Sequence, residues 1–409
     1  MVGGEALLPV PDWMPAFVVA PLFGGFSLAD FLGLFVLLNF ILVFVMFEIW
    51  LERKIGGHIQ LRRGPLHVGP HGALQSPADV VKLLVKEDLM PAAADRRVFK
   101  MAPYLVFIPV FLTFLIIPWG SLGPLYLVLR PFDLALVYLV AIPAVQAIGL
   151  VVAGWSSGNK YALLGSARFV AQLISYELPM VVALLGVAVL AESLSLTQVV
   201  DVQRQTAWFM FLQPIGFLIF LAASMAEMSR TPFDIAIAES EIVGGPFIEY
   251  SGMRWGMFFL AEFAAVCLNA ALAVALFMGG GQILPFFDNL AVAVPATAPV
   301  VEFLDSLSVL WFFGKTLTLI VLIQWARFTL PRLRIDQLMD LAWKVLLPAG
   351  FVNLILTAIY QMFGFVPFAI GLALTLFVTI FLLMGFREQR RAASGIQLVS
   401  VPRPVAAQT

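Results

Sequence analysis

The chain has 409 residues, of which 61% are hydrophobic and 12% charged, and its formal net charge is −1. This composition excludes an ordinary water-soluble globular protein, in which about a quarter of the residues are charged. The single cysteine, Cys267, excludes an iron–sulfur or zinc centre held by the cysteines of this chain alone. The three histidines, His58, His67 and His71, are separated by Gly-Pro turns, so we expect no metal site. We find no dinucleotide loop or P-loop and expect no nucleic-acid partner.

Nine apolar segments follow one another along the chain, each close to the ~20 residues that a helix needs to cross a bilayer. They cover residues 29–50, 103–119, 132–154, 169–191, 208–226, 257–279, 305–326, 341–362 and 365–386. The sequence therefore predicts an all-α integral membrane protein with about nine transmembrane helices. We expect a single integral domain over residues 1–386 and a polar C-terminal tail over residues 387–409.

Lysine and arginine are concentrated on one side of these segments. Of the 24 Lys and Arg residues, 21 lie in the C-terminal tail or in and beside the loops at about 51–102, 155–168, 227–256 and 327–340. Lys and Arg close to a span are retained in the cytoplasm. The sequence thus predicts a multi-pass protein of the cell (inner) membrane with cytoplasmic loops and C-terminus and an outer N-terminus.

The first of these loops combines Gly-Pro turns with a predicted amphipathic helix. Ser76-Pro77 is typical of a helix start, and from Val80 onward apolar and charged residues fall on opposite faces. Such a helix lies along the membrane surface or against a partner. We weigh two interpretations: a simple surface connector, or a polar doorway at the end of the first span lined by Glu52, Arg53 and Arg62.

The third loop is rich in acid around a single central arginine, Arg230. Its carboxylates are those of Glu227, Asp234, Glu239, Glu241 and Glu249. If residues 234–243 form a helix, Asp234 and Glu241 share one face. Clustered carboxylates repel one another, which raises some of their pKa values and suits a proton relay. The alternative is a solvated acidic loop, but interleaved apolar residues such as Ile235 and Phe247 favour burial and function.

Four ionisable residues lie inside predicted spans, where charge is costly and usually functional. They are Glu48, Glu177, Glu262 and Lys315. Glu48 and Glu262 are close enough to the span ends to reach water, so a simple solvated role stays open for them. Glu177 precedes Pro179, whose missing N–H frees a backbone carbonyl and leaves room for water.

Four long segments carry a resemblance to a known family. They are ERKIGGHIQLRRGPLHVGPHGALQSPADVVKLLVKED, GWSSGNKYALLGSARFVAQLISYELPM, AEMSRTPFDIAIAESEIVGGPFIEYSGMR and LPRLRIDQLMDLAWKVLLP. In them the chain resembles the membrane-embedded H subunits of proton-pumping NADH-quinone oxidoreductase, respiratory complex I. The resemblance implies an enzyme component that forms part of a quinone chamber and of an acidic path toward the pumping arm, without a complete active site of its own.

The resemblance also implies roles for particular residues and partners. The chamber residues would be Glu52, Arg53, Arg62, Arg230 and Asp234, and the proton or charge path would use Glu177, Glu227, Glu239, Glu241, Glu249 and Glu262. Quinone is the implied substrate, while NADH, flavin and iron–sulfur clusters belong to partner subunits. Hydrophilic subunits would cover the cytoplasmic loops, and small membrane subunits and antiporter-like pumping subunits would lie beside the chain in the bilayer.

Two positions depart from the family pattern. Ile237 stands where an acid is usual, and Leu66 stands where an asparagine is usual. The PFD and EYSG elements also occur in energy-converting membrane-bound hydrogenases, so the equivalent hydrogenase subunit is the alternative. The length of the first loop favours the quinone enzyme. An autonomous transporter is a third hypothesis, against which the long cytoplasmic loops and the lack of a visible repeat argue.

Overall fold

The computed structural model describes residues 21–23, 26–122, 125–126, 132–237, 239–283 and 306–364. The chain divides into two compact units, Met1–Leu354 and Ile355–Thr409. The second contributes only the end of one helix to the described residues. Two short hairpins are present, formed by β1 (Pro21–Phe23) with β2 (Phe26–Ser27) and by β3 (Ser121–Leu122) with β4 (Leu125–Tyr126). The remaining elements are helices.

Seven helical segments of the described chain are long and apolar enough to cross a membrane. They are α2 (Leu28–Ile59), α4 (Arg96–Thr113) with its 3₁₀ extension Phe114–Ile116, α5 (Ala135–Ser156), α6 (Lys160–Ala191), α11 (Gly252–Phe277), α14 (Ser308–Thr329), and the continuous run of α15 (Ile335–Asp340), a π-helical turn (Leu341–Leu346) and α16 (Leu347–Phe363). The prediction of an all-α membrane protein is confirmed.

The predicted count of nine spans is not confirmed. The segment predicted at 208–226 consists of two helices, α8 (Phe209–Leu212) and α9 (Pro214–Glu227), and the 14 residues of α9 fall short of the ~20 that a span needs. Gln213 separates them because the following Pro214 disfavours a helical backbone at its neighbour. The span predicted at 365–386 and the tail at 387–409 lie outside the described residues.

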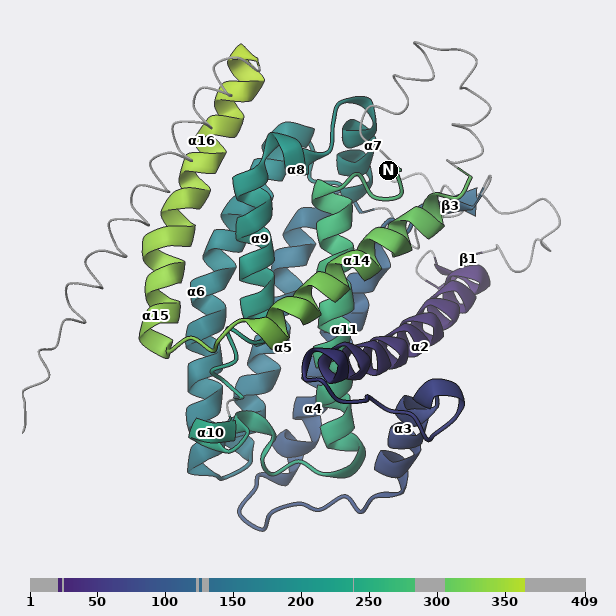
Figure 1. Ribbon diagram of the computed structural model, residues 1–409, viewed down its shortest axis with the longest axis vertical. Coiled ribbons are helices and arrows are strands. Elements are labelled where there is room, and N and C mark those ends of the chain that lie inside the picture. Colours follow the sequence, from purple (N-terminus) through teal and green to yellow (C-terminus); the bar gives the residue numbers. More distant parts are fainter. Residues whose placement is uncertain are drawn as a thin grey trace, which may run out of the picture. The chain divides into compact units, whose positions relative to one another are not determined.

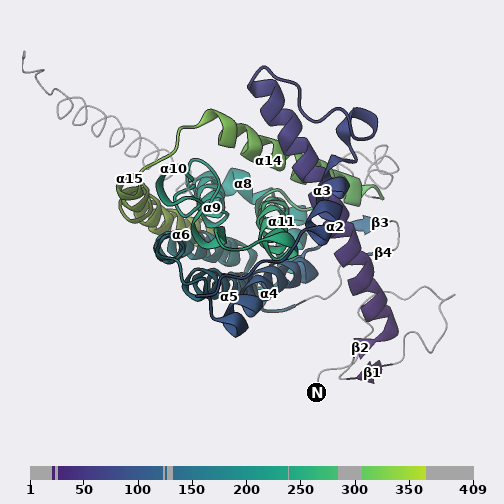
Figure 2. The same cartoon turned by 90° about the horizontal axis from the view of Figure 1, so that it is seen from below.

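Helix α11 is the centre of the helix packing in the first unit. It contacts α2, α4, α9 and α14, and α4, α5, α6 and α9 stand beside one another around it (Figure 2). Its inner surface is built largely from alanines such as Ala261, Ala264 and Ala270, which are fully buried and allow close approach of neighbouring helices. Helices α2 and α14 cross this group obliquely (Figure 1). The C-terminal parts of α2 and α14 lie next to α11, close to the loop over residues 229–250.

Short elements close the two ends of the long helices. At one end lie α3 (Gln75–Val85), α10 (Glu239–Ile242) and the 3₁₀ turn Gly245–Phe247, and at the other lie α7 (Leu196–Gln205) and α8 (Figure 1). The predicted amphipathic helix of the first loop is α3, although its N-cap is Leu74 rather than Ser76. The Gly-Pro segment before it contains one 3₁₀ turn, Pro70–Gly72.

The helix considered over residues 234–243 does not form. The described chain is non-helical from Asp234 to Ile237, and α10 spans only four residues. Ile235 and Ala236 are both buried, and the carbonyl of Ala236 packs against Gly245 so closely that an added Cβ there would lie 2.2 Å from the oxygen. This tertiary packing holds the segment in a non-helical conformation. The expectation that Asp234 and Glu241 share a helix face is therefore wrong.

Candidate functional site

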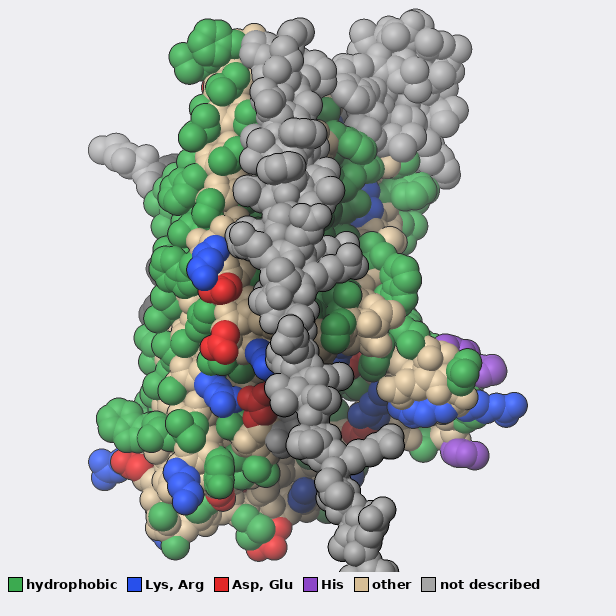
Figure 3. Space-filling model, turned by 60° about the vertical axis from the view of Figure 1, so that its left-hand side comes forward, with side chains coloured by type: hydrophobic (Ala, Val, Ile, Leu, Met, Phe, Trp, Pro, Cys, Tyr) green, Lys and Arg blue, Asp and Glu red, His purple; other side chains and the backbone are tan. Residues whose placement is uncertain are grey.

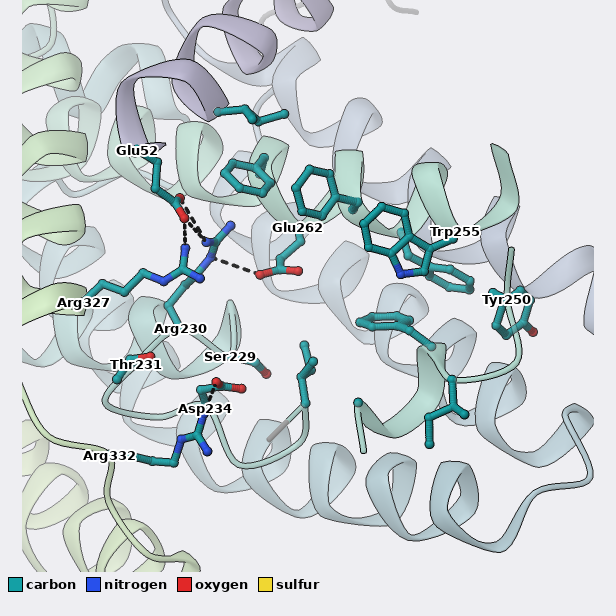
Figure 4. Close-up of a pocket in the computed structure, with 18 of the residues that line it drawn as sticks. Glu52, Ser229, Arg230, Thr231, Asp234, Tyr250, Trp255, Glu262, Arg327 and Arg332 are labelled. Carbon is teal, nitrogen blue, oxygen red and sulfur yellow. Dashed lines mark hydrogen bonds and ion pairs between the residues drawn. The ribbon is translucent and has the colours of Figure 1, made fainter. Parts of the chain in front are cut away.

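A cavity of about 730 Å³ lies where α2, α11 and α14 approach the loop over residues 229–250 (Figure 4). One part of its wall is aromatic, formed by Phe247, Trp255, Phe258, Phe259, Phe263 and Phe328. The other part is charged, with the carboxylates of Glu52, Asp234 and Glu262 and the guanidinium groups of Arg53, Arg230, Arg327 and Arg332. The cavity can therefore hold a flat apolar molecule that carries polar atoms at one end.

Arg230 is the centre of the charged wall and is 2% exposed. Its Nη1 lies 3.1 Å from Oε2 of Glu52, and its Nε lies 3.2 Å from Oε1 of Glu262. Arg327 of α14 also pairs with Glu52, so two arginines share one carboxylate (Figure 4). Burial disfavours a charged guanidinium, but the carboxylates of Glu262 and Glu52 outweigh it and hold the pKa of Arg230 above its ordinary value.

The backbone around Arg230 is held in place by α6. Gln172 is buried on α6, and its Nε2 donates to the carbonyl of Ala226 at 2.7 Å and to the carbonyl of Phe233 at 2.7 Å. One side chain thus fastens both ends of the turn that carries Arg230. The turn also contains Ser229 at a φ of 49°, a conformation that few non-glycine residues adopt. The ring of Phe263 lies under the guanidinium, 4.3 Å from its centroid.

Two ion pairs flank this centre. Arg53 donates to Asp79 of α3 at 2.7 Å, and Arg332 donates to Asp234 at 2.8 Å. Burial raises the pKa of Asp79, but the hydrogen bonds and charges of Arg53 and Lys82 outweigh it and lower the pKa. At Asp234 the balance is reversed: burial raises its pKa, and Arg332 opposes that rise only in part.

Buried donors in the cavity wall lack hydrogen-bond partners among the described residues. They are Oγ of Ser229 and Nη2 of Arg230, and Figure 4 shows both side chains beside the cavity. A buried donor without a partner costs free energy, about 1–3 kcal/mol for each group. Such a pair is suited to donate hydrogen bonds to an oxygen of a molecule bound in the cavity.

Glu48 extends the charged region into the helices. It is 1% exposed on α2 and accepts a hydrogen bond from Sγ of Cys267 at 2.7 Å and a long one from Gln324 at 3.5 Å. The sequence left open whether Glu48 reaches water at the end of a span. Because α2 continues to Ile59, Glu48 lies well inside the helix and is buried.

Glu177 and Glu227 are brought together, away from the large cavity. They line the same small hollow of about 10 Å³ between α5, α6 and α9. Glu227 also borders a second hollow of about 30 Å³, whose polar residues include Gln146 and Asn269. The larger hollow has room for a water molecule beside Glu227, whereas the hollow that both carboxylates line is at the lower size limit for one.

The other predicted site residues lie apart from the cavity. Glu241 pairs with Arg168 of α6 at 2.5 Å, and Glu249 accepts from Asn159 at 2.8 Å. Arg62 is exposed and donates to Gln60 in the first loop. The side chain of Glu239 lies outside the described part of the structure. No group of three or more His, Cys, Asp or Glu side chains among the described residues could hold a metal ion.

Two arginines of the wall were not predicted as site residues. Arg327 lies in the last turn of α14, and Arg332 follows that helix by three residues. Arg332 belongs to a segment that resembles the known family and Arg327 lies just before it, but the sequence assigned both only to a basic loop. The signal that could have found them is the excess of carboxylates in the third loop, which requires cations from another part of the chain.

The fold and the cavity define a multi-pass membrane protein with an aromatic and ionic chamber at the ends of its helices. The family model described as NADH dehydrogenase matches residues 32–358. The H subunit of NADH-quinone oxidoreductase from Dehalococcoides mccartyi is 45% identical over 77% of this chain and 82% of its own length. The corresponding H subunit from Geobacillus kaustophilus is 43% identical over 78% of this chain and 90% of its own length. The chain belongs to the NADH dehydrogenase family, that of the H subunits of NADH-quinone oxidoreductase.

Proposed function

We propose that this chain is the membrane subunit of a proton-translocating NADH-quinone oxidoreductase and that its large cavity forms part of the quinone chamber. The observation that carries the proposal is the pair of buried donors without partners, Ser229 and Arg230, beside an aromatic wall. A quinone has a flat apolar ring that suits such a wall and carbonyl oxygens that accept hydrogen bonds. The family membership supports the same ligand class.

Reduction of quinone adds two electrons and two protons and gives quinol. The electrons come from an iron–sulfur cluster of a neighbouring hydrophilic subunit, since NADH, flavin and clusters are assigned to partners. The protons are taken up near the ring. This chain supplies the surroundings: four arginines and three carboxylates line the cavity, so negative charge that arrives with the electrons is stabilised before the protons follow.

The carboxylates next to the cavity respond to that charge. Glu52 and Glu262 both hold Arg230, and any movement of Arg230 toward a reduced quinone weakens its attraction for them. The next carboxylates along the path are Glu227 and Glu177, and Glu48 is buried on α2 beside Cys267 of α11. We propose that protons or charge pass from the chamber through these groups, with Glu239, Glu241 and Glu249 at the loop surface.

We further propose that the loops around the chamber face the cytoplasm and are covered by hydrophilic partner subunits. Charged side chains gather on the half of the surface near the first-loop histidines, while most of the other half is apolar (Figure 3). The N-terminus then lies outside, and small membrane subunits and antiporter-like subunits pack against the lipid-facing helices. Copurification of these subunits separates this proposal from the hydrogenase alternative, in which a nickel–iron subunit is copurified instead.

Substitution of Arg230 tests the chamber. We expect Arg230→Gln to lower kcat/KM for a short-chain quinone by about 10- to 100-fold, since a hydrogen bond from a charged group contributes roughly 1.5–3 kcal/mol. Arg230→Lys keeps the charge but cannot reach Glu52, Glu262 and a quinone at once, so it should remain impaired. The measurement is NADH:quinone activity of the purified complex at matched assembly.

A surface lysine supplies the control for this test. Lys344 is exposed and pairs with Asp340 one turn away, so Lys344→Gln should keep the parental rate. Assembly is read from copurified subunits, and electron entry is read from NADH oxidation with an artificial acceptor. A parental quinone rate in Arg230→Gln would remove Arg230 from the chamber.

A further inference from the structure

A second hollow lies on the outer surface of the helix group, between α4 and α5. Its volume is about 330 Å³, and it is lined by Met101, Tyr104, Leu105, Ile108 and Leu112 of α4 and by residues of α5 such as Val145. The size falls within the ~300–1,000 Å³ of pockets that bind small molecules. No charged residue lines it, and it has no part in the chamber or in the acidic path.

The shape of this groove follows from how the two helices meet. At Gly149 the backbones are in contact, because a Cβ there would lie 2.7 Å from Val106 and 2.9 Å from the carbonyl carbon of Leu105. On the outer side of this contact, Met101, Tyr104 and Ile108 form one stripe along α4 and are each at least half exposed. The stripe from Met101 to Leu112 is roughly 17 Å long at about 1.5 Å per residue.

The cytoplasmic end of the stripe is basic. Arg97 lies four residues before Met101, and Lys100 lies four residues before Tyr104. Both basic residues therefore continue the helical face of the stripe. Both are exposed, and neither forms an ion pair with a carboxylate in the described part of the chain. They also lie in the first turn and a half of α4, where the helix dipole adds to the positive potential, and the N-cap residue there, Asp95, accepts a hydrogen bond from the backbone N–H of Arg97. On α5, Trp155 lies at the height of this basic end and is 74% exposed, as is typical of a tryptophan at the membrane–water interface.

We propose that this groove binds one anionic phospholipid of the inner leaflet. One acyl chain lies along Met101, Ile108 and Leu112, and the phosphate is held by Arg97 and Lys100. The charge complementarity selects the anionic headgroup, and the apolar groove leading away from the basic end selects a lipid over a free phosphate. A basic cluster beside transmembrane helices on the cytoplasmic side is the kind of site that such headgroups occupy.

The test uses the assembled complex in nanodiscs of phosphatidylcholine that contain a small fraction of photoreactive lipid. The probe is phosphatidylglycerol with a diazirine in one acyl chain, and the reference is the same diazirine chain on phosphatidylcholine. Crosslinked peptides are identified by mass spectrometry. We expect peptides from α4 and α5 to be labelled more strongly by phosphatidylglycerol, by about fivefold for each basic residue that contacts the headgroup.

Two variants separate the headgroup from the groove. Arg97→Gln with Lys100→Gln should abolish the preference for phosphatidylglycerol, whereas Ile108→Trp should fill the groove and reduce labelling by both lipids. The controls are Arg63→Gln with Lys86→Gln, two exposed cytoplasmic charges of the first loop, and Ile174→Trp, an equally exposed isoleucine of α6. Both controls should label as the parental protein does.

Three outcomes would overturn the proposal. Equal labelling by the two lipids would show an unselective lipid surface. Displacement of the label by a short-chain quinone, with no effect of unlabelled phosphatidylglycerol, would assign the groove to quinone. Absence of labelling by either lipid would show that a neighbouring subunit covers the groove.

Discussion

Arg230 determines the charge pattern of the chamber because it is buried against two carboxylates and an aromatic ring. A buried cation is stable only while its partners stay charged, and removing one partner of such a pair costs about 3–5 kcal/mol. Arg327 provides a second cation for Glu52, so the carboxylate is not left alone when Arg230 moves. The site is thus built to tolerate a shift of one arginine during a reaction.

Ile237 is one of the two residues at which the sequence departs from the family pattern that it resembles. It lines the cavity beside Asp234, where arginines outnumber carboxylates by four to three. An added carboxylate would therefore meet an excess of positive charge. We predict that Ile237→Glu assembles and retains quinone reductase activity within about twofold, since a charge that finds partners costs little.

Ile242 provides the matched comparison for this variant. It is 3% exposed and does not line the cavity, so a glutamate there would be buried away from the four arginines of the cavity wall. We expect Ile242→Glu to lower the amount of assembled complex severalfold. Loss of activity in a fully assembled Ile237→Glu complex would mean that the chamber needs an apolar side chain at this position.

Glu177 tests the proposed path away from the chamber. Glu177→Gln keeps size and hydrogen-bonding ability but removes the charge, so we expect proton translocation coupled to quinone reduction to fall by roughly tenfold while the protein stays folded. The measurement is acidification in proteoliposomes with the rate of NADH oxidation recorded in parallel. Glu192→Gln, an exposed change at the end of α6, is the control. An unchanged proton-to-electron ratio would make Glu177 a structural residue.

At the scale of elements, hydropathy predicted the long helices because a bilayer leaves their backbones no other way to satisfy hydrogen bonds. Each of the helices α2, α4, α5, α6, α11 and α14 overlaps one of the predicted spans over most of its length. Hydropathy did not foresee the break at Gln213, where two short helices share one apolar run. Nor did it foresee the non-helical segment from Asp234 to Ile237, because contacts with Gly245 and Arg332 override the local helical pattern.

The residues of the candidate site, like the helices, were predicted from the sequence in large part but not completely. Glu52, Arg53, Arg230, Asp234 and Glu262 were chosen from charge and resemblance, and the structure brings all five to one cavity. Arg327 and Arg332 were missed because nothing local shows which distant cation will face an acidic loop. The ion pairs of these two arginines depend on the angle at which α14 packs across α11, and tertiary packing of this kind cannot be derived from a local sequence pattern.

The ion pair between Arg53 and Asp79 ties α3 to the end of α2. The pKa of Asp79 in the folded protein lies below its ordinary value. The pair therefore contributes its full stabilisation at any pH above the ordinary pKa, and this stabilisation is lost only as the pH falls through the lowered pKa. We predict that Asp79→Asn speeds hydrogen exchange over residues 75–85 by up to about fivefold at neutral pH, as expected for a partly exposed pair.

The pH dependence of the exchange rates tests whether the effect belongs to Asp79. Between pH 6 and 9 the difference between Asp79→Asn and the parental complex should stay constant, because Asp79 is ionised throughout. Glu87→Gln, an exposed change just after α3, should exchange as the parental protein does. A difference that grows toward pH 6 would assign the effect to another group.

At the scale of the whole molecule, the separation of charge along the helices and the position of the chamber agree. Helices α3 and α10 lie at one end of the long helices and α7 lies at the other (Figure 1). The loops at the end with α3 and α10 carry most of the lysines and arginines, and the loop over residues 229–250 that lines the chamber is one of them. The proposed topology therefore places the chamber and the loops around it on one side of the membrane. Under the proposed function, this arrangement would let a hydrophilic partner deliver electrons without crossing the bilayer.

Cysteine labelling tests that topology directly, because the only cysteine of the chain, Cys267, is buried and should give little background. We predict that His71→Cys in the first loop reacts with an impermeant maleimide only in inside-out vesicles. The reaction should rise severalfold after the hydrophilic subunits are stripped with a chaotrope, since we place them over this loop. Gln205→Cys, exposed at the end of α7, should react only in right-side-out vesicles. Labelling of His71→Cys from the outer face would reverse the topology and separate the chamber from its proposed electron donor.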